Sequence, residues 1–189
     1  MSAADYIKVL ENVFPHEVCD LLISEFNKNL DKVPPRKPGA DMCPEPMAMF
    51  TQEILNIVDP ILGIYLDSYL QDKIGENYED YLLDSVSILK YRNGDSYMLH
   101  PDNPFQITDK QAGTGRYFPL QMIVYLNEGY KGGEVEFPDY GIKHAPSKGD
   151  ILVFPTGFAF PHKVYKVDSD RYILLCAVLK VGKDYIDEE

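Results

Sequence analysis

The hydrophobic pattern of this chain changes near Asp84, from helical spacing to short apolar runs broken by turns. Before that point, apolar residues recur every three or four positions after Phe14-Pro15 and again from Phe50 to about Leu70, which predicts two helices. After it, runs with strand character alternate with turn-forming pairs such as Asn93-Gly94. Helices followed by many short strands favour a mainly β, α+β fold in which helices buttress a β-sandwich or jelly roll. The predicted strands lie near 6–10, 85–92, 97–101, 117–127, 133–137, 150–155, 161–166 and 171–180.

Length and composition favour one domain. The chain has 189 residues, 45% of them hydrophobic, so residues 1–189 are expected to share one core, with 1–84 as the mainly helical buttress and 85–180 as the jelly-roll core. The net charge of -12 argues against a nucleic-acid partner, whose backbone needs a basic face. Oligomeric state and source stay open.

Several features favour a cytoplasmic protein, of a bacterial cell or a virus-infected host, that is not secreted. No apolar run approaches the ~20 residues that a membrane span needs. The first residues lack the basic and then apolar pattern of a secretory signal. Cys19, Cys43 and Cys176 are scattered without a Cys-x-x-Cys pair, which is typical of reduced thiols.

His100-Pro-Asp102 is the first candidate for chemistry. Positions i and i+2 of an extended strand point to the same side, so this imidazole and this carboxylate can reach one point in space. His162 follows after further predicted strands and could supply a third ligand. Two histidines and one carboxylate, with open positions left, form the facial triad of non-haem Fe(II) oxygenases. A His-x-Asp pair on its own has a simpler interpretation, a hydrogen-bonded histidine at a strand end.

Arg171 begins an apolar strand after His162. An arginine that faces a core needs an anion, and a dicarboxylate cosubstrate would supply one. The alternative is a surface salt bridge with Asp168 or Asp170. Two segments are candidate lids over such a site: residues 31–47, which contain five prolines and could equally be a mere connector, and residues 103–116.

A set of motifs follows in order over about residues 85–180. These are Tyr91-Arg-Asn-Gly-Asp-Ser-Tyr-Met-Leu-His-Pro-Asp-Asn103, Tyr125-Leu-Asn127, Gly132-Gly-Glu-Val-Glu-Phe-Pro138, Lys148-Gly-Asp-Ile-Leu-Val-Phe154, Pro161-His-Lys-Val164 and Arg171-Tyr172. The set resembles the prolyl 4-hydroxylase group of Fe(II)/2-oxoglutarate-dependent dioxygenases. Within that group it is most similar to the hypoxia-inducible-factor prolyl hydroxylases and their bacterial and viral relatives.

The resemblance implies a double-stranded β-helix with iron at one mouth. By it, Fe(II) would be held by His100, Asp102 and His162. Arg171 and Tyr125 would bind the distal carboxylate of 2-oxoglutarate, and Tyr91 would lie near the cosubstrate's metal-binding end. The implied requirements are Fe(II), 2-oxoglutarate and O2, with ascorbate as an optional addition.

The implied reaction is hydroxylation of a prolyl residue at C4, in a protein or peptide substrate, with release of succinate and CO2. Two alternatives remain at this point: the same chemistry on another side chain, a free amino acid or a small molecule, and a non-catalytic jelly-roll binding module. The strand after Arg171 departs from the animal sensor enzymes, because Leu175 and Ala177 are apolar where those enzymes carry a polar residue and a Trp.

Overall fold

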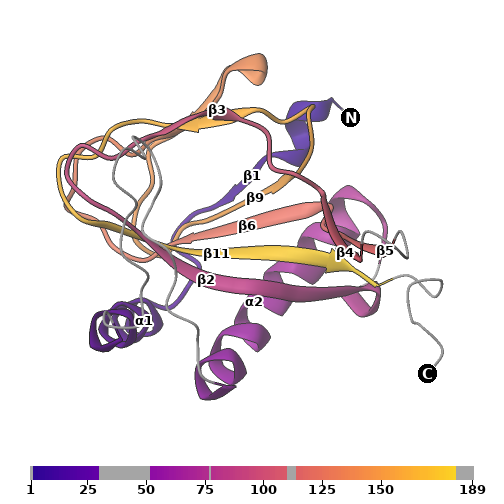
Figure 1. Cartoon of the computed structure of the whole chain (residues 1–189), viewed down its shortest axis with the longest axis horizontal. Coiled ribbons are helices and arrows are strands. Elements are labelled where there is room, and N and C mark those ends of the chain that lie inside the picture. The colour runs from indigo at the N-terminus through magenta and orange to yellow at the C-terminus, as the bar shows by residue number, and fades with distance from the viewer. Residues whose placement is uncertain (1, 30–51, 77, 110–113, 182–189) are drawn as a thin grey trace.

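The computed structural model describes residues 2–29, 52–76, 78–109 and 114–181, and the predicted loop 31–47 lies outside this part. Two helices precede most of the strands, as predicted (Figure 1). In chain order the elements are η1 (Ala3–Tyr6), β1 (Lys8–Leu10), α1 (His16–Lys28), α2 (Gln52–Lys73), η3 (Tyr78–Asp80), β2 (Tyr81–Tyr91), β3 (Tyr97–His100), β4 (Phe105–Asp109), β5 (Thr114–Tyr117), β6 (Leu120–Tyr125), β7 (Val135–Phe137), η4 (Pro138–Tyr140), β8 (Ile142–His144), β9 (Ile151–Pro155), β10 (His162–Val164) and β11 (Arg171–Lys180).

The strands form two main antiparallel sheets and a separate hairpin. The larger sheet has the order β1-β9-β6-β11-β2, the smaller one β3-β10-β7-β8, and β4 pairs with β5. Helices α1 and α2 lie against one face of the larger sheet, and the smaller sheet faces its other side (Figure 1). The predicted fold class, a mainly β jelly roll with buttressing helices, is therefore confirmed.

The central strands are apolar because they are covered on both faces. In β6 every residue is buried, and successive side chains enter different cores. Met122 and Val124 pack with the helices, whereas Ile123 and Tyr125 face the smaller sheet. The period of two along a strand produces this division, so one strand supplies both the helix-facing core and the wall of the site.

Three short strands were not predicted, namely β4, β5 and β8. The first two pair with each other and overlap residues 103–116, which the sequence interpretation treated as a lid candidate. Each of these strands is short. Each forms because it pairs with a neighbouring strand, and its sequence has no hydrophobic run that would predict it. Among the described residues, no helix combines the length and apolarity needed to cross a membrane.

Neighbouring leucines of α1 provide a matched test of this packing. Leu22 is fully buried against the larger sheet, whereas Leu21 is 37% exposed. Leu22→Ala should lower the free energy of unfolding by about 2–5 kcal/mol, because it removes apolar contacts and leaves a cavity. Leu21→Ala should cost less than about 1 kcal/mol. Urea unfolding of both variants checks this, and equal losses would contradict the described face of α1.

Candidate metal centre and cosubstrate pocket

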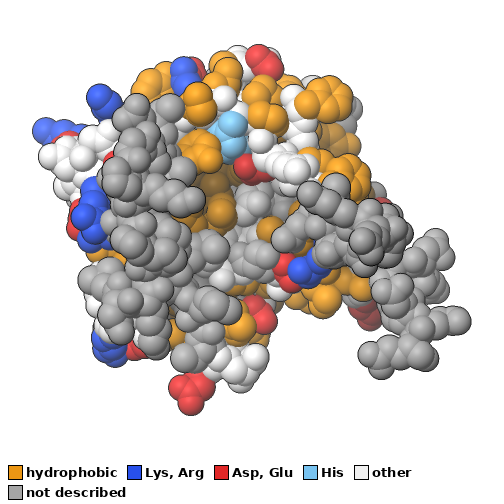
Figure 2. Space-filling view, viewed as in Figure 1, with side chains coloured by type: hydrophobic (Ala, Val, Ile, Leu, Met, Phe, Trp, Pro, Cys, Tyr) orange, Lys and Arg blue, Asp and Glu red, His pale blue; other side chains and the backbone are white. Residues whose placement is uncertain are grey.

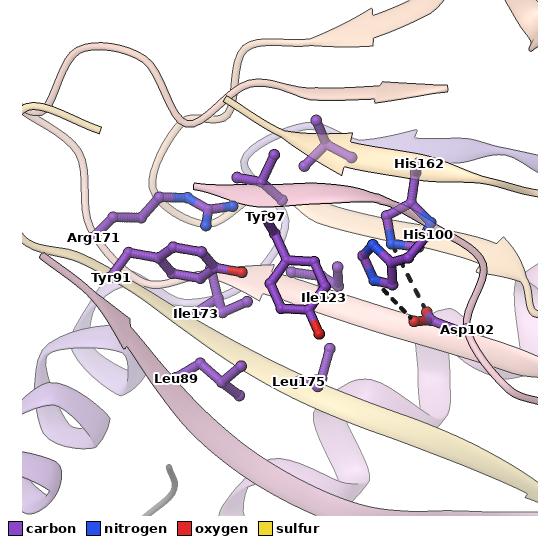
Figure 3. Close-up of a pocket in the computed structure, with 12 residues that line it drawn as sticks. Leu89, Tyr91, Tyr97, His100, Asp102, Ile123, His162, Arg171, Ile173 and Leu175 are labelled. Atoms are coloured by element: carbon purple, nitrogen blue, oxygen red, sulfur yellow. Dashed lines mark ion pairs between the residues drawn. The ribbon is translucent and has the colours of Figure 1, made fainter. Parts of the chain in front are cut away.

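The structure brings His100, Asp102 and His162 together at one end of a cavity. Their ligand atoms all lie within 4.8 Å of one another. His100 Nε2 is 3.5 Å from Asp102 Oδ1, and His162 Nε2 is 4.0 Å from Asp102 Oδ2 (Figure 3). Two imidazole nitrogens and one carboxylate that converge on one point match the donor set of a facial triad for Fe(II).

Backbone carbonyls fix the orientation of both histidine rings. His100 Nδ1 lies 2.8 Å from the Met98 carbonyl oxygen, and His162 Nδ1 lies 3.2 Å from that of Phe160. A carbonyl can only accept, so each Nδ1 carries the proton and each Nε2 keeps its lone pair for a metal. The backbone thereby selects the tautomer that a metal ligand requires.

The two histidines differ in their electrostatic surroundings. Burial lowers the pKa of His162, and this effect outweighs the nearby Asp102 carboxylate. Burial acts in the same direction on His100, but its hydrogen bonds with Asp102 and the Met98 carbonyl raise its pKa overall. His162 is therefore the more readily available of the two as a neutral ligand.

Asp102 reaches the centre differently from the prediction. The sequence suggested that both members of the His-x-Asp pair lie on one strand. In the structure, His100 is the last residue of β3 and Asp102 lies in the following loop. The Asp102 carbonyl accepts a 2.8 Å hydrogen bond from the Gly157 amide, which ties this loop to the segment that precedes β10 and His162.

Arg171 lies at the other end of the same cavity, and its side chain is fully buried. As the first residue of β11 it pairs across the sheet with Tyr91. The guanidinium carbon is 4.6 Å from the Tyr91 ring centroid and 5.3 Å from that of Tyr125. The alternative surface salt bridge is wrong, because Asp170 instead pairs with Lys90 at 2.7 Å and Arg171 is fully buried.

The cavity between these ends has a volume of about 260 Å³. Its walls are mostly apolar side chains from β2, β6 and β11, with Tyr97 beside the metal ligands (Figure 3). The Tyr97 ring centroid is 4.2 Å from that of His100. Leu175, which departs from the animal sensor enzymes, lines this wall, whereas Ala177 does not. The cavity can therefore hold a small molecule that is polar at both ends and apolar in the middle.

Unpaired buried groups test whether a dicarboxylate fits here. Within the described part of the chain, Nε and Nη1 of Arg171 and the Tyr125 hydroxyl are buried without a hydrogen-bond partner. Burial also raises the pKa of Tyr125, so its hydroxyl keeps the proton and can donate. Buried donors of this kind need an acceptor. A carboxylate supplies acceptor oxygens and also a negative charge that balances the positive charge of the buried guanidinium.

Tyr130 and Gly133 pack beside Arg171, and the sequence interpretation assigned neither of them to the site. Gly133 has a φ of +71°, and an added Cβ would lie 3.0 Å from Arg171 Cδ and 3.2 Å from Tyr130 Cε2. A side chain at Gly133 would therefore displace the arginine or the tyrosine ring. The signal available in the sequence was the pair of glycines between two strands.

His144 supports the Arg171 end of the cavity from behind Tyr125, and the sequence interpretation did not assign it to the site. It ends β8, its side chain is only 13% exposed, and its ring packs edge-on against Tyr125 at 5.6 Å between centroids. His144 Nε2 is 3.2 Å from Oδ2 of the buried Asp150. Burial lowers the pKa of His144 despite that carboxylate, so this ring supports Tyr125 as a neutral group.

Removing the carboxylate of the triad should abolish metal binding. Loss of a partner outside the ligand set costs metal sites about 10–100-fold in affinity, so loss of a ligand in Asp102→Ala should exceed about 100-fold for Fe(II). Anaerobic calorimetry with Fe(II) measures this. Asp139→Ala, which removes an exposed carboxylate of η4, is the matched control and should bind as the wild type does. Wild-type affinity in Asp102→Ala would contradict the assignment.

Comparison with solved structures finds the same fold in prolyl hydroxylases. A viral collagen prolyl hydroxylase from Paramecium bursaria Chlorella virus-1, in complex with 2-oxoglutarate, matches with a TM-score of 0.68 at 20% identity, over 94% of this chain and 97% of that one. A prolyl-4-hydroxylase from Pseudomonas putida matches with a TM-score of 0.66 at 18% identity, over 94% of each chain.

A third match is a prolyl hydroxylase from Trichoplax adhaerens in complex with a peptide of the hypoxia-inducible-factor oxygen degradation domain. Its TM-score is 0.65 at 15% identity, over 97% of this chain and 88% of that one. No protein in the curated set matches the sequence significantly.

The sequence itself matches a family over the segment that carries the site. Residues 86–178 match the model of the 2OG-Fe(II) oxygenase superfamily, whose members use Fe(II) and 2-oxoglutarate. This segment includes the triad and Arg171, with the cavity between them. The chain thus contains a domain of the 2OG-Fe(II) oxygenase superfamily, built on the fold that prolyl 4-hydroxylases share.

Proposed function

We propose that this protein hydroxylates a prolyl residue of a protein or peptide at C4, in a reaction that converts 2-oxoglutarate and O2 into succinate and CO2. The observation that carries the proposal is one cavity with the His100, Asp102 and His162 cluster at its mouth and a fully buried Arg171, with two unpaired nitrogens, at its far end. The prolyl part is supported by the fold shared with prolyl hydroxylases, one of them bound to a peptide.

Each end of the cavity has a defined task in this proposal. His100, Asp102 and His162 hold Fe(II), and Arg171 with Tyr125 holds the distal carboxylate of 2-oxoglutarate, so that its keto acid end faces the metal. Tyr91 lies between the two ends, with its hydroxyl directed into the cavity (Figure 3). The apolar wall keeps water away from the reacting groups.

The bound cofactors supply the oxidation itself. When Fe(II) and 2-oxoglutarate are in place, one atom of O2 enters succinate as 2-oxoglutarate loses CO2, and the other enters a C–H bond of the substrate. The protein contributes the geometry: it fixes one carboxylate at Arg171 and leaves the mouth open beside the metal ligands.

Exposed hydrophobic side chains close in sequence to the metal ligands support a polypeptide substrate. Nine large hydrophobic side chains are exposed in the described part of the chain, and four lie within five residues of a metal ligand: Met98, Leu99, Phe105 and Phe158. Figure 2 shows a hollow on this face with hydrophobic side chains around it and a histidine at its rim. Such a surface suits a chain that crosses the mouth better than a small molecule enclosed within it.

A second cavity, of about 420 Å³, lies next to the metal ligands. Phe105, Tyr117 and Phe158 line it together with Gly157, whose amide binds the Asp102 carbonyl. Among the residues that the structure describes, those that line this cavity carry no charge. It therefore offers an aromatic surface to apolar residues that flank the target residue.

Succinate formation tests the proposed reaction. Purified protein, loaded with Fe(II) under anaerobic conditions and then exposed to air, should form succinate from 2-oxoglutarate. A proline-containing peptide from a panel should stimulate this turnover and gain one oxygen atom on its proline, as mass spectrometry of the fragments would locate. Turnover that only small molecules stimulate would contradict the prolyl substrate. Absence of turnover in the protein with bound Fe(II) would contradict the oxygenase.

Phe158 provides a test of the polypeptide surface, because it is 93% exposed. Phe158→Ser should raise the KM for a peptide substrate by about 5- to 30-fold, as truncation of an aromatic contact does in interfaces, without changing the KM for 2-oxoglutarate. Ile64→Ser is the matched control, because Ile64 is 69% exposed but lies on α2, across the larger sheet from the cavity. Equal peptide KM values in all three proteins would contradict this role.

A further inference from the structure

Tyr130 adds a further unpaired group beside Arg171, since both side chains pack against Gly133. Its hydroxyl is buried and has no hydrogen-bond partner among the described residues, like the Tyr125 hydroxyl and two nitrogens of Arg171. The pKa of Tyr130 is raised by burial, and the charge of Arg171 offsets part of this rise. The hydroxyl therefore keeps its proton and can donate.

Packing around Gly133 explains why Tyr130 is held there. A Cβ at this position would lie 2.9 Å from Val167 Cγ1, 3.0 Å from Arg171 Cδ and 3.2 Å from Tyr130 Cε2, so the Tyr130 ring and the Arg171 stem both pack against the backbone of Gly133. Gly133 N also donates to the Lys166 carbonyl, which fixes the loop that carries Tyr130 beside the segment leading to β11. Packing against Gly133 and this hydrogen bond together hold Tyr130 in place.

These groups cannot satisfy one another. Arg171 has only donors, and the only acceptors among the four groups are the two tyrosine oxygens. Even if these oxygens accept from Arg171 and one hydroxyl donates to the other, at least one hydroxyl proton still lacks an acceptor. An unpaired buried donor is costly, and this end of the cavity holds four such groups. A carboxylate has two oxygens with about four lone-pair positions, so one carboxylate can accept from all four.

We propose that Tyr130 donates a hydrogen bond to the carboxylate that Arg171 and Tyr125 bind, and is therefore a further binding residue for the distal end of 2-oxoglutarate. The inference rests on the cosubstrate pocket proposed above. It makes the pocket selective for 2-oxo acids that carry a second carboxylate, because a ligand without one leaves four buried donors unpaired.

Binding measurements with two ligands test this role. Anaerobic calorimetry of the Fe(II)-loaded protein gives the Kd of 2-oxoglutarate and of 2-oxobutyrate, which has the same keto acid end but no distal carboxylate. Tyr130→Phe should raise the Kd of 2-oxoglutarate about 10-fold or more, because it removes a hydrogen bond to a charged group. It should leave the Kd of 2-oxobutyrate unchanged.

Two further variants separate the possible outcomes. Tyr65→Phe removes a hydroxyl that donates to the Val13 carbonyl on the helix side, and should bind both ligands as the wild type does. If Tyr125→Phe weakens 2-oxoglutarate binding but Tyr130→Phe does not, the role of Tyr130 is overturned and the pocket stands. If Tyr130→Phe weakens both ligands equally, its role is structural and the inference is also overturned. If Arg171→Gln, Tyr125→Phe and Tyr130→Phe all bind 2-oxoglutarate normally, the proposed pocket itself is overturned.

Discussion

A guanidinium group that is fully buried between two β-sheets needs an anion, and most of the site is arranged around the one on Arg171. Its strand, β11, pairs with β2 on one side and β6 on the other. The register places Tyr91 opposite Arg171 and Tyr125 opposite Ile173, so both tyrosines reach the guanidinium from neighbouring strands. Three strands thus build a binding site for a negative charge that the described chain does not itself supply.

The metal-ligand triad depends on the smaller sheet. Strand β10 pairs with β3 so that His162 lies opposite His100, and their ring centroids are 4.5 Å apart. The hydrogen bond from the Gly157 amide to the Asp102 carbonyl then holds the Asp102 carboxylate beside both histidine rings. Since each sheet carries one end of the site, the spacing of the sheets sets the distance between the metal ligands and Arg171.

The sequence predicted the parts of this arrangement whose signals are local. Periodicity predicted both helices and the long strands. The site residues were predicted from the His-x-Asp pair and from the positions of His162 and Arg171 after it, and the structure places all of them around one cavity. Tyr130 and His144 were missed because a loop and a three-residue strand bring them to Arg171 and Tyr125, and no local pattern encodes that approach. Gly133 was the one local signal of the close approach between Tyr130 and Arg171, because a glycine is required where two side chains pack against the backbone.

A crystal structure of the protein with Mn(II) and 2-oxoglutarate, prepared under anaerobic conditions so that no reaction occurs, would test the central claim most directly. The account predicts metal density between His100 Nε2, the Asp102 carboxylate and His162 Nε2. It also predicts one carboxylate of 2-oxoglutarate on Arg171, with the keto acid end at the metal. A metal bound elsewhere, or an Arg171 guanidinium that makes no contact with the ligand, would contradict it.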